Sequence, residues 1–430
     1  MNRVMSRCVF LAVLAATLSL PALADNLKGV KAERVGMSSE RLDRLSALNR
    51  KYVEEGKLAG VMTMVARHGK IVHLNAEGVF GVNDERPLTE DTLFRIYSMT
   101  KPITAVALMM LYEEGAFQLS DPVSKFLPQF EKMTAWEQGH YEDAKSPITM
   151  HQLLTHTSGL TYGFHKKNPV DERYQNEKLN EAKDLDEFID RLTKIPLLFH
   201  PGERWNYSVA SDVLGAVAEK ISGQPYDEFL KQRIFKPLGM NDTFFNVPAD
   251  KLARLATNHY WNPKAKKLGA MGENNVINQF TGRTLFSGGG GLVSTIGDYM
   301  KFAEMLRQGG RLGKARILSP KTVQYMSMNH LPATVTATGS GESPGTNLST
   351  TFKGTGFGLG FGVLTDPAFS GVMSSKGAYY WGGAAGTLFW IDPKEDLVAV
   401  SMMQLMGSPW PYRSEMMVTT YQAINELHNP

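Results

Sequence analysis

The chain has 430 residues, of which 43% are hydrophobic, so it can bury a full core in one large or two medium domains and is not disordered. Its formal net charge is +3, and the loss of two N-terminal arginines argued for below would leave +1, which excludes a charge-driven partner such as nucleic acid or an acidic membrane. Its only cysteine, Cys8, would be lost with the same segment, so disulfides, a thiol nucleophile and cysteine-bound metal are excluded in the mature chain. We therefore expect a small-molecule partner.

Residues 1–24 have the pattern of a secretory signal peptide. Arg3 and Arg7 supply positive charge ahead of a short apolar run over residues 9–20. Small residues follow, which predicts cleavage near Ala24. The apolar run is shorter than the about 20 residues that a membrane span needs. We expect an exported protein, periplasmic or secreted, with no stable membrane span in the mature chain.

The elements expected next are a helix, a hairpin and a long helical section. Leucines at helical spacing after a capping serine predict a helix over residues 38–55. Residues 61–66 and 71–76 are β-prone runs, and Gly69 between them permits the positive φ of a tight turn. From about 103 to 252 helical stretches alternate with proline and glycine breaks, so this section should be mostly helical.

The elements expected in the last third are two helices, a long loop and three strands. The helices are expected at residues 296–306 and 415–427, the Gly/Ser/Thr-rich loop at 333–354, and the strands at 358–365, 387–391 and 397–405. Strands at both ends of the chain around a helical middle predict one sheet that is built from segments distant in sequence.

Ser98 and Lys101 form the first candidate for catalysis. A serine hydroxyl is a weak nucleophile, so a catalytic serine needs a nearby base and donors for the oxyanion. If Pro102 lies in the first turn of a helix, the lysine amine shares a face with the serine hydroxyl three residues earlier. A lysine serves as a base only when burial or nearby cations lower its pKa. The bare spacing also fits a capping serine beside a solvated lysine, but the strongly apolar segment that follows favours a buried pair.

Several motifs in order carry a resemblance to a known family. They are Leu-Phe-Arg-Ile-Tyr-Ser-Met-Thr-Lys-Pro at residues 93–102, Leu-Leu-Thr-His-Thr-Ser-Gly-Leu at 153–160, and Pro-Gly at 201–202 before Tyr207. With these motifs the chain resembles the class C β-lactamase and penicillin-binding-protein superfamily, and is similar in particular to the family VIII bacterial carboxylesterases. The resemblance extends from about Ser38 to the C-terminus.

The resemblance implies an α+β fold of the β-lactamase/transpeptidase type. An antiparallel sheet flanked by helices would be accompanied by a largely helical domain, with the active site between them. On this basis residues 25–105 and 288–430 should form the α/β domain, and residues 106–287 the mostly helical domain. The alternation of expected strands and helices along the chain agrees with this division.

The resemblance also assigns the catalytic residues. Ser98 would be the nucleophile, Lys101 its partner, and Tyr207 would match the tyrosine that acts as general base and acid. Without the match, Tyr207 is equally a core phenol with one hydrogen bond. No cofactor is implied.

A second group of matching residues would bind the substrate. Trp381-Gly382-Gly383 falls where β-lactamases carry Lys-Thr-Gly on the strand that edges the active site. The backbone N–H groups of Ser98 and Ala384 would then form the oxyanion hole. Glycines would let this strand edge approach a substrate closely.

Two departures from the β-lactamase pattern bear on the substrate. Tyr207-Ser208-Val209 stands where penicillin-recognising enzymes have Tyr-x-Asn, and Trp381 replaces the lysine of Lys-Thr-Gly. Both changes remove polar groups, which favours an uncharged ester and therefore a carboxylesterase. A β-lactamase or a D-amino-acid peptidase acting on cell-wall amides is the alternative hydrolase. A non-catalytic binding protein is the alternative of another class.

Other candidate motifs are weaker. Ser343 lies in a G-x-S-x-G pattern, but within the expected loop instead of between a strand and a helix. The glycines at 288–291 lack the lysine of a phosphate-binding loop and predict a packing turn. His156 lies in a motif that is structural in the family, so we do not expect it to be a catalytic base. The histidines show no H-E-x-x-H or comparable cluster, so no metal site is expected.

Overall fold

The structure is a computed structural model that describes residues 29–164, 168–272, 278–335, 337 and 353–428. The predicted signal peptide and the motif around Ser343 lie outside these residues. Most of the loop expected at 333–354 lies outside them as well.

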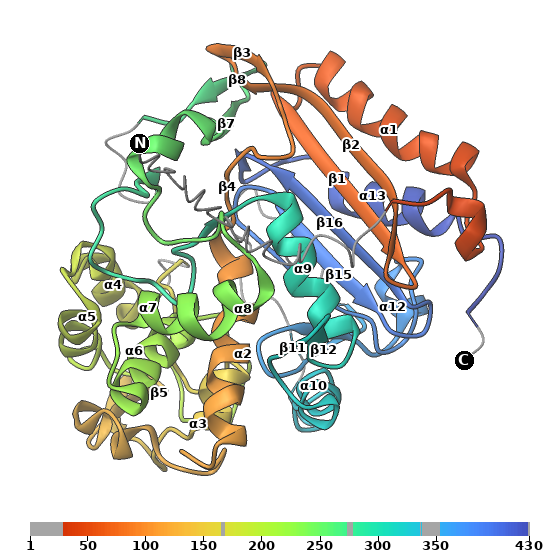
Figure 1. The fold of residues 1–430 in the computed structure, drawn as a ribbon. Helices are drawn as coiled ribbons and strands as arrows, with labels where there is room; N and C mark the ends of the chain where they lie inside the picture. Colours follow the sequence, from red (N-terminus) through yellow and green to blue (C-terminus); the bar gives the residue numbers. More distant parts are fainter. Residues whose placement is uncertain (1–28, 165–167, 273–277, 336, 338–352, 429–430) are drawn as a thin grey trace, which may run out of the picture.

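An antiparallel eight-stranded sheet is the centre of the fold (Figure 1). In sheet order its strands are β12 (Thr355–Phe357), β13 (Gly362–Leu364), β14 (Tyr379–Gly382), β15 (Leu388–Asp392), β16 (Leu397–Met403), β1 (Gly60–Arg67), β2 (Lys70–Gly81) and β3 (Asp84–Pro87). The two ends of the chain meet where β1 pairs with β16, with Val61 opposite Met403. The predicted α+β fold with an antiparallel sheet is confirmed.

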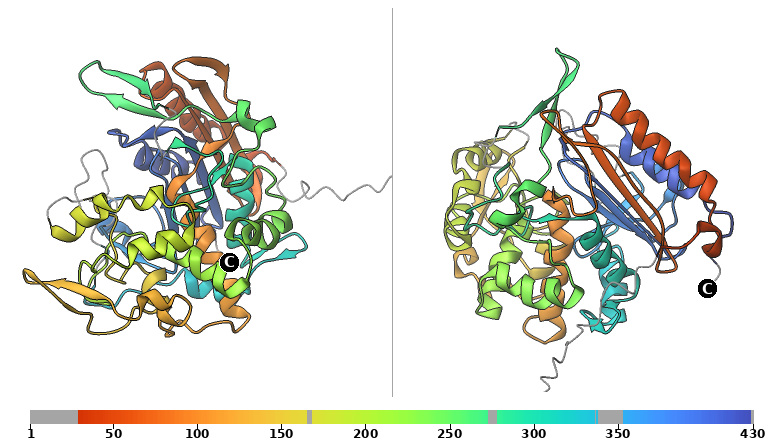
Figure 2. Two further views of the ribbon diagram at one scale, coloured as in Figure 1. Left: turned by 90° about the vertical axis from the view of Figure 1, so that its left-hand side faces the viewer. Right: turned by 45° about the horizontal axis from the view of Figure 1, so that its top comes forward.

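Helices cover both faces of this sheet. The two views of Figure 2 show α1 (Ser39–Glu54) and α13 (Tyr412–Tyr421) side by side on one face, while α9 (Ile296–Arg307) lies on the other. Along β15, Leu388 and Trp390 pack in the core under α1 and α13, whereas Phe389 and Ile391 pack in the opposite core. This alternation follows from the two-residue period of a strand, which makes β15 apolar on both faces.

The helical part of the molecule is built around α2 (Thr100–Glu113), which is buried over most of its length and packs on α6 (Ala210–Ser222). The remaining helices here are α3 (Met150–Leu154), α4 (Pro169–Asn176), α5 (Leu185–Leu192), α7 (Tyr226–Leu230) and α8 (Lys236–Leu238). A short hairpin of β5 (Thr134–Glu137) and β6 (His140–Asp143) interrupts this otherwise helical section.

Smaller elements complete the described structure. They are β4 (Phe94–Arg95) paired with β9 (Val293–Ser294), β7 (His259–Asn262) with β8 (Lys267–Ala270) and β17 (Leu405–Met406), β10 (Arg311–Leu312) with β11 (Ala315–Arg316), and the helices α10 (Pro320–Met326) and α12 (Pro367–Ser370). Among the described residues, no helix combines the length and the apolar character that a bilayer crossing requires.

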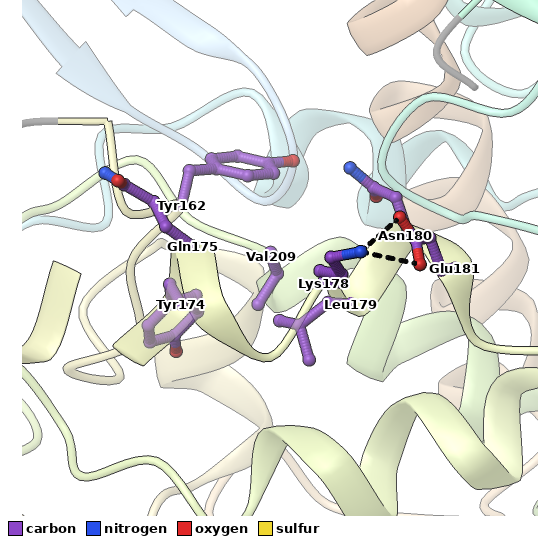
Figure 3. A pocket seen from close by; sticks show the side chains of 8 residues that line it. All are labelled: Tyr162, Tyr174, Gln175, Lys178, Leu179, Asn180, Glu181 and Val209. Carbon is purple, nitrogen blue, oxygen red and sulfur yellow. Dashed lines mark hydrogen bonds and ion pairs between the residues drawn. The ribbon is translucent and has the colours of Figure 1, made fainter. Parts of the chain in front are cut away.

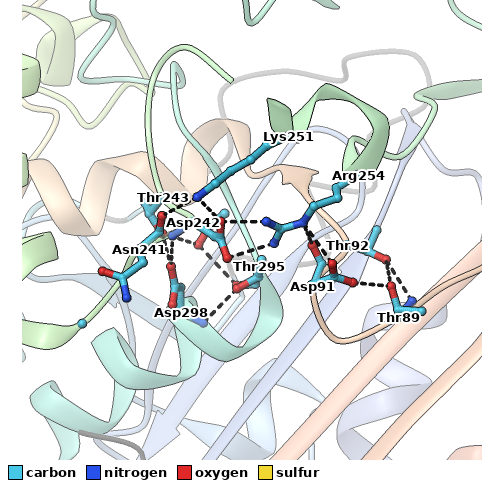
Figure 4. A network of polar contacts seen from close by, with 12 residues as sticks. Thr89, Asp91, Thr92, Asn241, Asp242, Thr243, Lys251, Arg254, Thr295 and Asp298 are labelled. Carbon is cyan, nitrogen blue, oxygen red and sulfur yellow. Dashed lines mark hydrogen bonds and ion pairs between the residues drawn. The ribbon is translucent and has the colours of Figure 1, made fainter. Parts of the chain in front are cut away.

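A network of ion pairs ties the loop after α8 to α9 and to the segment before β4 (Figure 4). Asp242 accepts hydrogen bonds from Lys251 at 2.8 Å and from Arg254 at 2.9 Å. Its own backbone N–H donates to Asp298 of α9 at 2.7 Å, and Arg254 also pairs with Asp91 at 3.1 Å. Through Asp91, the network holds the segment that leads into β4.

Two predicted elements differ from the structure. The single strand expected at 358–365 is wrong, because a turn separates β12 from β13. Gly360 in this turn has φ 91°, and a Cβ there would lie 2.3 Å from Cβ of Ala105, so the glycine lets the turn pack on α2. The last helix ends at Tyr421, before the expected residue 427, because the chain leaves it to form a β-bridge between Ile424 and Met37.

Candidate active site

Ser98 lies in a short 3-10 turn, Tyr97–Met99, directly before α2. Tyr97 has φ 43°, a left-handed conformation that costs a tyrosine about 1–3 kcal/mol and needs support from its surroundings. Asn258 donates a hydrogen bond to the Tyr97 hydroxyl at 2.7 Å, and Phe280 contacts the ring edge-on at 5.8 Å. The strained residue turns the chain so that the half-buried Ser98 sits at the start of the buried helix.

Lys101 is only 1% exposed, and its amine makes three contacts. Nζ donates to the carbonyl of Gly289 at 2.6 Å, to the hydroxyl of Tyr162 at 2.8 Å and to Oγ of Ser98 at 3.4 Å. An ammonium has three N–H donors, so each has one acceptor. The predicted pair of Ser98 and Lys101 is therefore brought together in a buried setting.

Tyr207 covers the same amine. Nζ of Lys101 lies 4.6 Å from the centre of the Tyr207 ring. The Tyr207 hydroxyl is buried and has no hydrogen-bond partner among the described residues. Burial raises the pKa of Tyr162, and the nearby Tyr207 also helps to raise it. The three predicted catalytic residues thus share one site, and their roles remain a prediction.

The turn at residues 288–291 positions the lysine as well as packing the fold. While the Gly289 carbonyl accepts from Lys101, its N–H donates to Asp212 at 3.1 Å. Ser287 donates to the same carboxyl at 2.5 Å. Burial raises the pKa of Asp212, and the nearby Lys101 ammonium opposes this rise. A Cβ on Gly289 would lie 2.4 Å from Oδ2 of Asp212, so only glycine allows this contact.

Trp381 forms an aromatic wall of the site. It lies on β14, is 5% exposed, and its ring is centred 5.5 Å from Tyr207 and 5.3 Å from Phe357. The register of β14 with β13 covers Tyr379 and Tyr380, so Trp381 lies past that pairing. The structure places Trp381 beside Tyr207, as the resemblance implied.

The glycines after Trp381 lie close to other parts of the protein. A Cβ on Gly382 would lie 2.8 Å from the guanidinium of Arg413, and one on Gly383 would lie 2.4 Å from the carbonyl of Ile96. Both glycines therefore leave room for protein atoms, a reason that the sequence does not show. Close approach of a substrate at this strand stays a prediction.

Arg413 of α13 holds the turn that carries Ala384. Its guanidinium donates to the carbonyls of Gly383 at 2.5 Å, Thr387 at 3.0 Å and Gly386 at 3.4 Å. Burial lowers the pKa of Arg413 to about 10, which leaves it charged at neutral pH. Ala384 is exposed, and its N–H donates to no backbone or side-chain acceptor in the described part of the chain. This amide therefore has no acceptor there, and its role in an oxyanion hole stays a prediction.

Comparison with known proteins decides the family, because a family model described as Beta-lactamase matches residues 45–418. The chain belongs to the Beta-lactamase family. Esterase EstB from Burkholderia gladioli is 32% identical over 367 residues, which cover 81% of this chain and 86% of EstB. Lovastatin esterase from Penicillium rubens is 28% identical over 82% of this chain and 90% of its own.

Solved structures agree with this assignment to the family. EstCE1, described as a hydrolase with promiscuous acyltransferase activity, aligns with a TM-score of 0.75 and 26% identity over 90% of this chain and 99% of its own. Simvastatin synthase (LovD) from Aspergillus terreus aligns with a TM-score of 0.75 and 25% identity over 90% and 98%. The β-lactamase and penicillin-binding-protein type of fold predicted from the motifs is confirmed.

His156 is buried in this family member. Among the described residues, no hydrogen bond joins it to Ser98. Its Nδ1 lies 3.0 Å from Oγ of Ser208, and its ring is centred 5.1 Å from that of Tyr207. Burial lowers the pKa of His156 well below its usual value, so the ring is neutral. Through these contacts His156 packs against Tyr207, which fits a structural role.

The described residues include one group of side chains with metal-ligand spacing in this family member. Glu137, His200 and Glu203 place ligand atoms within 4.8 Å of one another. However, Nδ1 of His200 accepts the backbone N–H of Lys145 at 3.3 Å, so the proton of a neutral ring is on Nε2, which faces Glu142 at 2.9 Å. With Nε2 protonated, the ring offers no lone pair, and the group is better described as a hydrogen-bonded ion cluster.

Three residues of this site were not predicted from the sequence. Tyr162 and Arg413 each contact a predicted residue from a distant segment, and Asp212 interacts electrostatically with Lys101. Burial, with smaller effects of Tyr207 and Asp212, raises the pKa of Tyr162, so its hydroxyl is neutral where it accepts from Lys101. The consecutive glycines at 288–291 were the one visible signal, since such a run indicates close backbone approach.

Proposed function

We propose that this Beta-lactamase family member is a carboxylesterase that hydrolyses uncharged esters through an acyl-enzyme on Ser98. The observation that carries the proposal is the buried Lys101 amine, which contacts the Ser98 hydroxyl and lies against the Tyr207 ring. A hydroxyl next to a positioned proton acceptor is the arrangement that nucleophilic catalysis needs.

The proposed reaction has two halves. Oγ of Ser98 attacks the ester carbonyl carbon while its proton passes to the pair of Lys101 and Tyr207, which reacts in the form that has already lost one proton. The N–H groups of Ser98 and Ala384 hold the oxyanion, and Tyr207 protonates the leaving alcohol as the ester bond breaks. Water then attacks the acyl-enzyme, gives its proton to the same pair, and releases the carboxylic acid with Ser98 restored.

The surroundings favour an ester over a β-lactam. Trp381 and Val209 present apolar surface where the β-lactamase pattern has a lysine and an asparagine. A β-lactam carries a carboxylate and an amide, and neither finds a polar partner in an indole or a valine side chain. The named esterases among the relatives support the same preference.

Labelling and substrate comparison test the proposal. A fluorophosphonate should label the wild-type protein, and Ser98→Ala should abolish the labelling. Turnover of p-nitrophenyl butyrate should exceed that of a chromogenic cephalosporin. Efficient turnover of the cephalosporin alone would favour the β-lactamase or D-amino-acid peptidase alternative, and absence of labelling would favour a binding protein.

We also propose that the protein is exported, because Arg3 and Arg7 precede an apolar run and small residues. N-terminal sequencing of the protein from the periplasm or the medium should start near Asp25. A chain that retains Met1 and stays in the cytoplasm would contradict this.

A further inference from the structure

A pocket of about 300 Å³ lies beside Tyr162 (Figure 3). We call it the Tyr162 pocket. Its apolar lining comes from Tyr162, Tyr174, Leu179 and Val209, and its polar lining from Gln175 of α4 and from residues 178, 180 and 181. A volume at the low end of ligand sites, roughly 300–1,000 Å³, suits one part of a substrate instead of the whole molecule.

The lining of the Tyr162 pocket selects against charge. Two tyrosine rings, a leucine and a valine supply apolar surface. Among the described residues that line the pocket, Lys178 and Glu181 are the charged ones; they pair with each other at 3.4 Å and are largely exposed, so their charges offset one another (Figure 3). Asn180 adds an exposed amide, which can bond a hydroxyl or a carbonyl of an occupant.

The Tyr162 pocket shares two of its residues with the candidate active site. The Tyr162 hydroxyl accepts the hydrogen bond from Lys101, and the same tyrosine contacts the ring of Tyr207 at 5.2 Å. Val209 is two residues after Tyr207, and its N–H donates to the carbonyl of Thr161. A group in the pocket therefore lies against the two segments that hold Lys101 and Tyr207 in place.

We propose that the Tyr162 pocket binds one arm of the ester substrate, either the acyl or the alkyl part. This arm is uncharged and largely apolar. At roughly 30 Å³ per water-sized group, the pocket holds about ten non-hydrogen atoms. This inference rests on the proposed esterase function. It makes the protein selective for esters with one chain of medium length or one small ring system, in preference to acetate or ethyl esters.

Filling the pocket from its exposed rim tests the inference. Asn180→Trp should lower the ratio of kcat/KM for p-nitrophenyl octanoate over acetate, or for octyl over ethyl acetate, at least tenfold. Glu181→Phe places a ring in the same lining and should act in the same direction. The surface pair of Glu181 with Lys178 contributes little to stability, so its loss should not unfold the protein. The matched control is Asn176→Trp, an exposed asparagine at the end of α4 that does not line the pocket.

The outcomes separate the two proposals. A tenfold fall in either series with Asn180→Trp, but not with Asn176→Trp, supports the inference. Ratios that stay within twofold of wild type in both series, with the short esters still hydrolysed, overturn the inference and leave the esterase proposal standing. A wild-type protein that hydrolyses none of the four esters overturns the esterase proposal and the inference with it.

Discussion

Nζ of Lys101 lies closer to the carbonyl oxygen of Gly289, at 2.6 Å, than to Oγ of Ser98, at 3.4 Å. With Tyr162 at 2.8 Å, two of its three acceptors belong to the surrounding protein and only one to the nucleophile. The position of the amine therefore depends mainly on the surrounding protein and only in part on Ser98. Because the amine is positioned largely without the serine, mutations of Ser98 and of Lys101 should have different effects on stability.

We expect Ser98→Ala to abolish fluorophosphonate labelling while the melting temperature stays near that of wild type, because the amine keeps two of its acceptors. Lys101→Ala should lower kcat about 10²–10⁴-fold, because Tyr207 loses the amine with which it shares the serine proton. It should also lower the melting temperature, since it leaves Asp212 buried without its nearby cation. Thermal melts and burst kinetics of both variants measure this. Equal melting temperatures would contradict this difference between the two residues.

Tyr162→Phe removes one acceptor from the Lys101 amine and keeps the ring. A hydrogen bond to a charged group contributes about 1.5–3 kcal/mol, so we expect kcat to fall about 10- to 100-fold. The matched control is Tyr52→Phe, whose hydroxyl donates to Glu415 at 2.6 Å and does not contact Lys101. If the two variants have the same kcat, the Tyr162 hydroxyl has no part in positioning the amine.

Arg413→Met removes the three hydrogen bonds that hold the turn around Ala384. A misplaced oxyanion donor weakens binding of the transition state more than of the substrate, so kcat should fall, up to about 10²–10³-fold, with KM little changed. Arg44→Met is the control, because Arg44 donates to Gln422 on the surface, away from this turn. A lower melting temperature with unchanged kcat would reduce Arg413 to a structural residue.

His73 makes the fold sensitive to acid. Burial lowers its pKa from 6.5 to about 4, and its Nε2 lies 2.9 Å from Oγ1 of Thr63. The unfolded chain therefore binds the proton more readily than the folded chain, so stability is lost as the pH falls from 6.5 towards 4, by at most about 3 kcal/mol. His73→Gln should flatten this loss in denaturant titrations near pH 7 and pH 5. His140→Gln, at an exposed site, should not.

Local patterns explain what the sequence could predict. The capping serine of α1 is Ser38, which accepts the N–H of Arg41, and Gly69 has φ 68° in the turn between β1 and β2. Ser98 and Lys101 are one helical turn apart, so their spacing alone places them together. Each of these features depends on neighbours within a few residues, and such information is present in the sequence itself.

Contacts between distant segments explain what the sequence could not predict. Arg413 reaches Gly383 from another element, and Tyr162 reaches Lys101 across 61 positions. The break between β12 and β13 has the same origin, because Gly360 turns where α2 leaves no room for a side chain. None of these residues stands in a periodic pattern, so their partners become visible only when the chain is folded.

The pairing of β1 with β16 has a consequence for biosynthesis. Ser98 is translated well before Trp381, Ala384 and Arg413. A nascent or truncated chain holds a serine without the amides and the indole that would complete its surroundings. Under the proposed esterase function, hydrolysis would therefore require the late residues to be made and β16 to pair with β1.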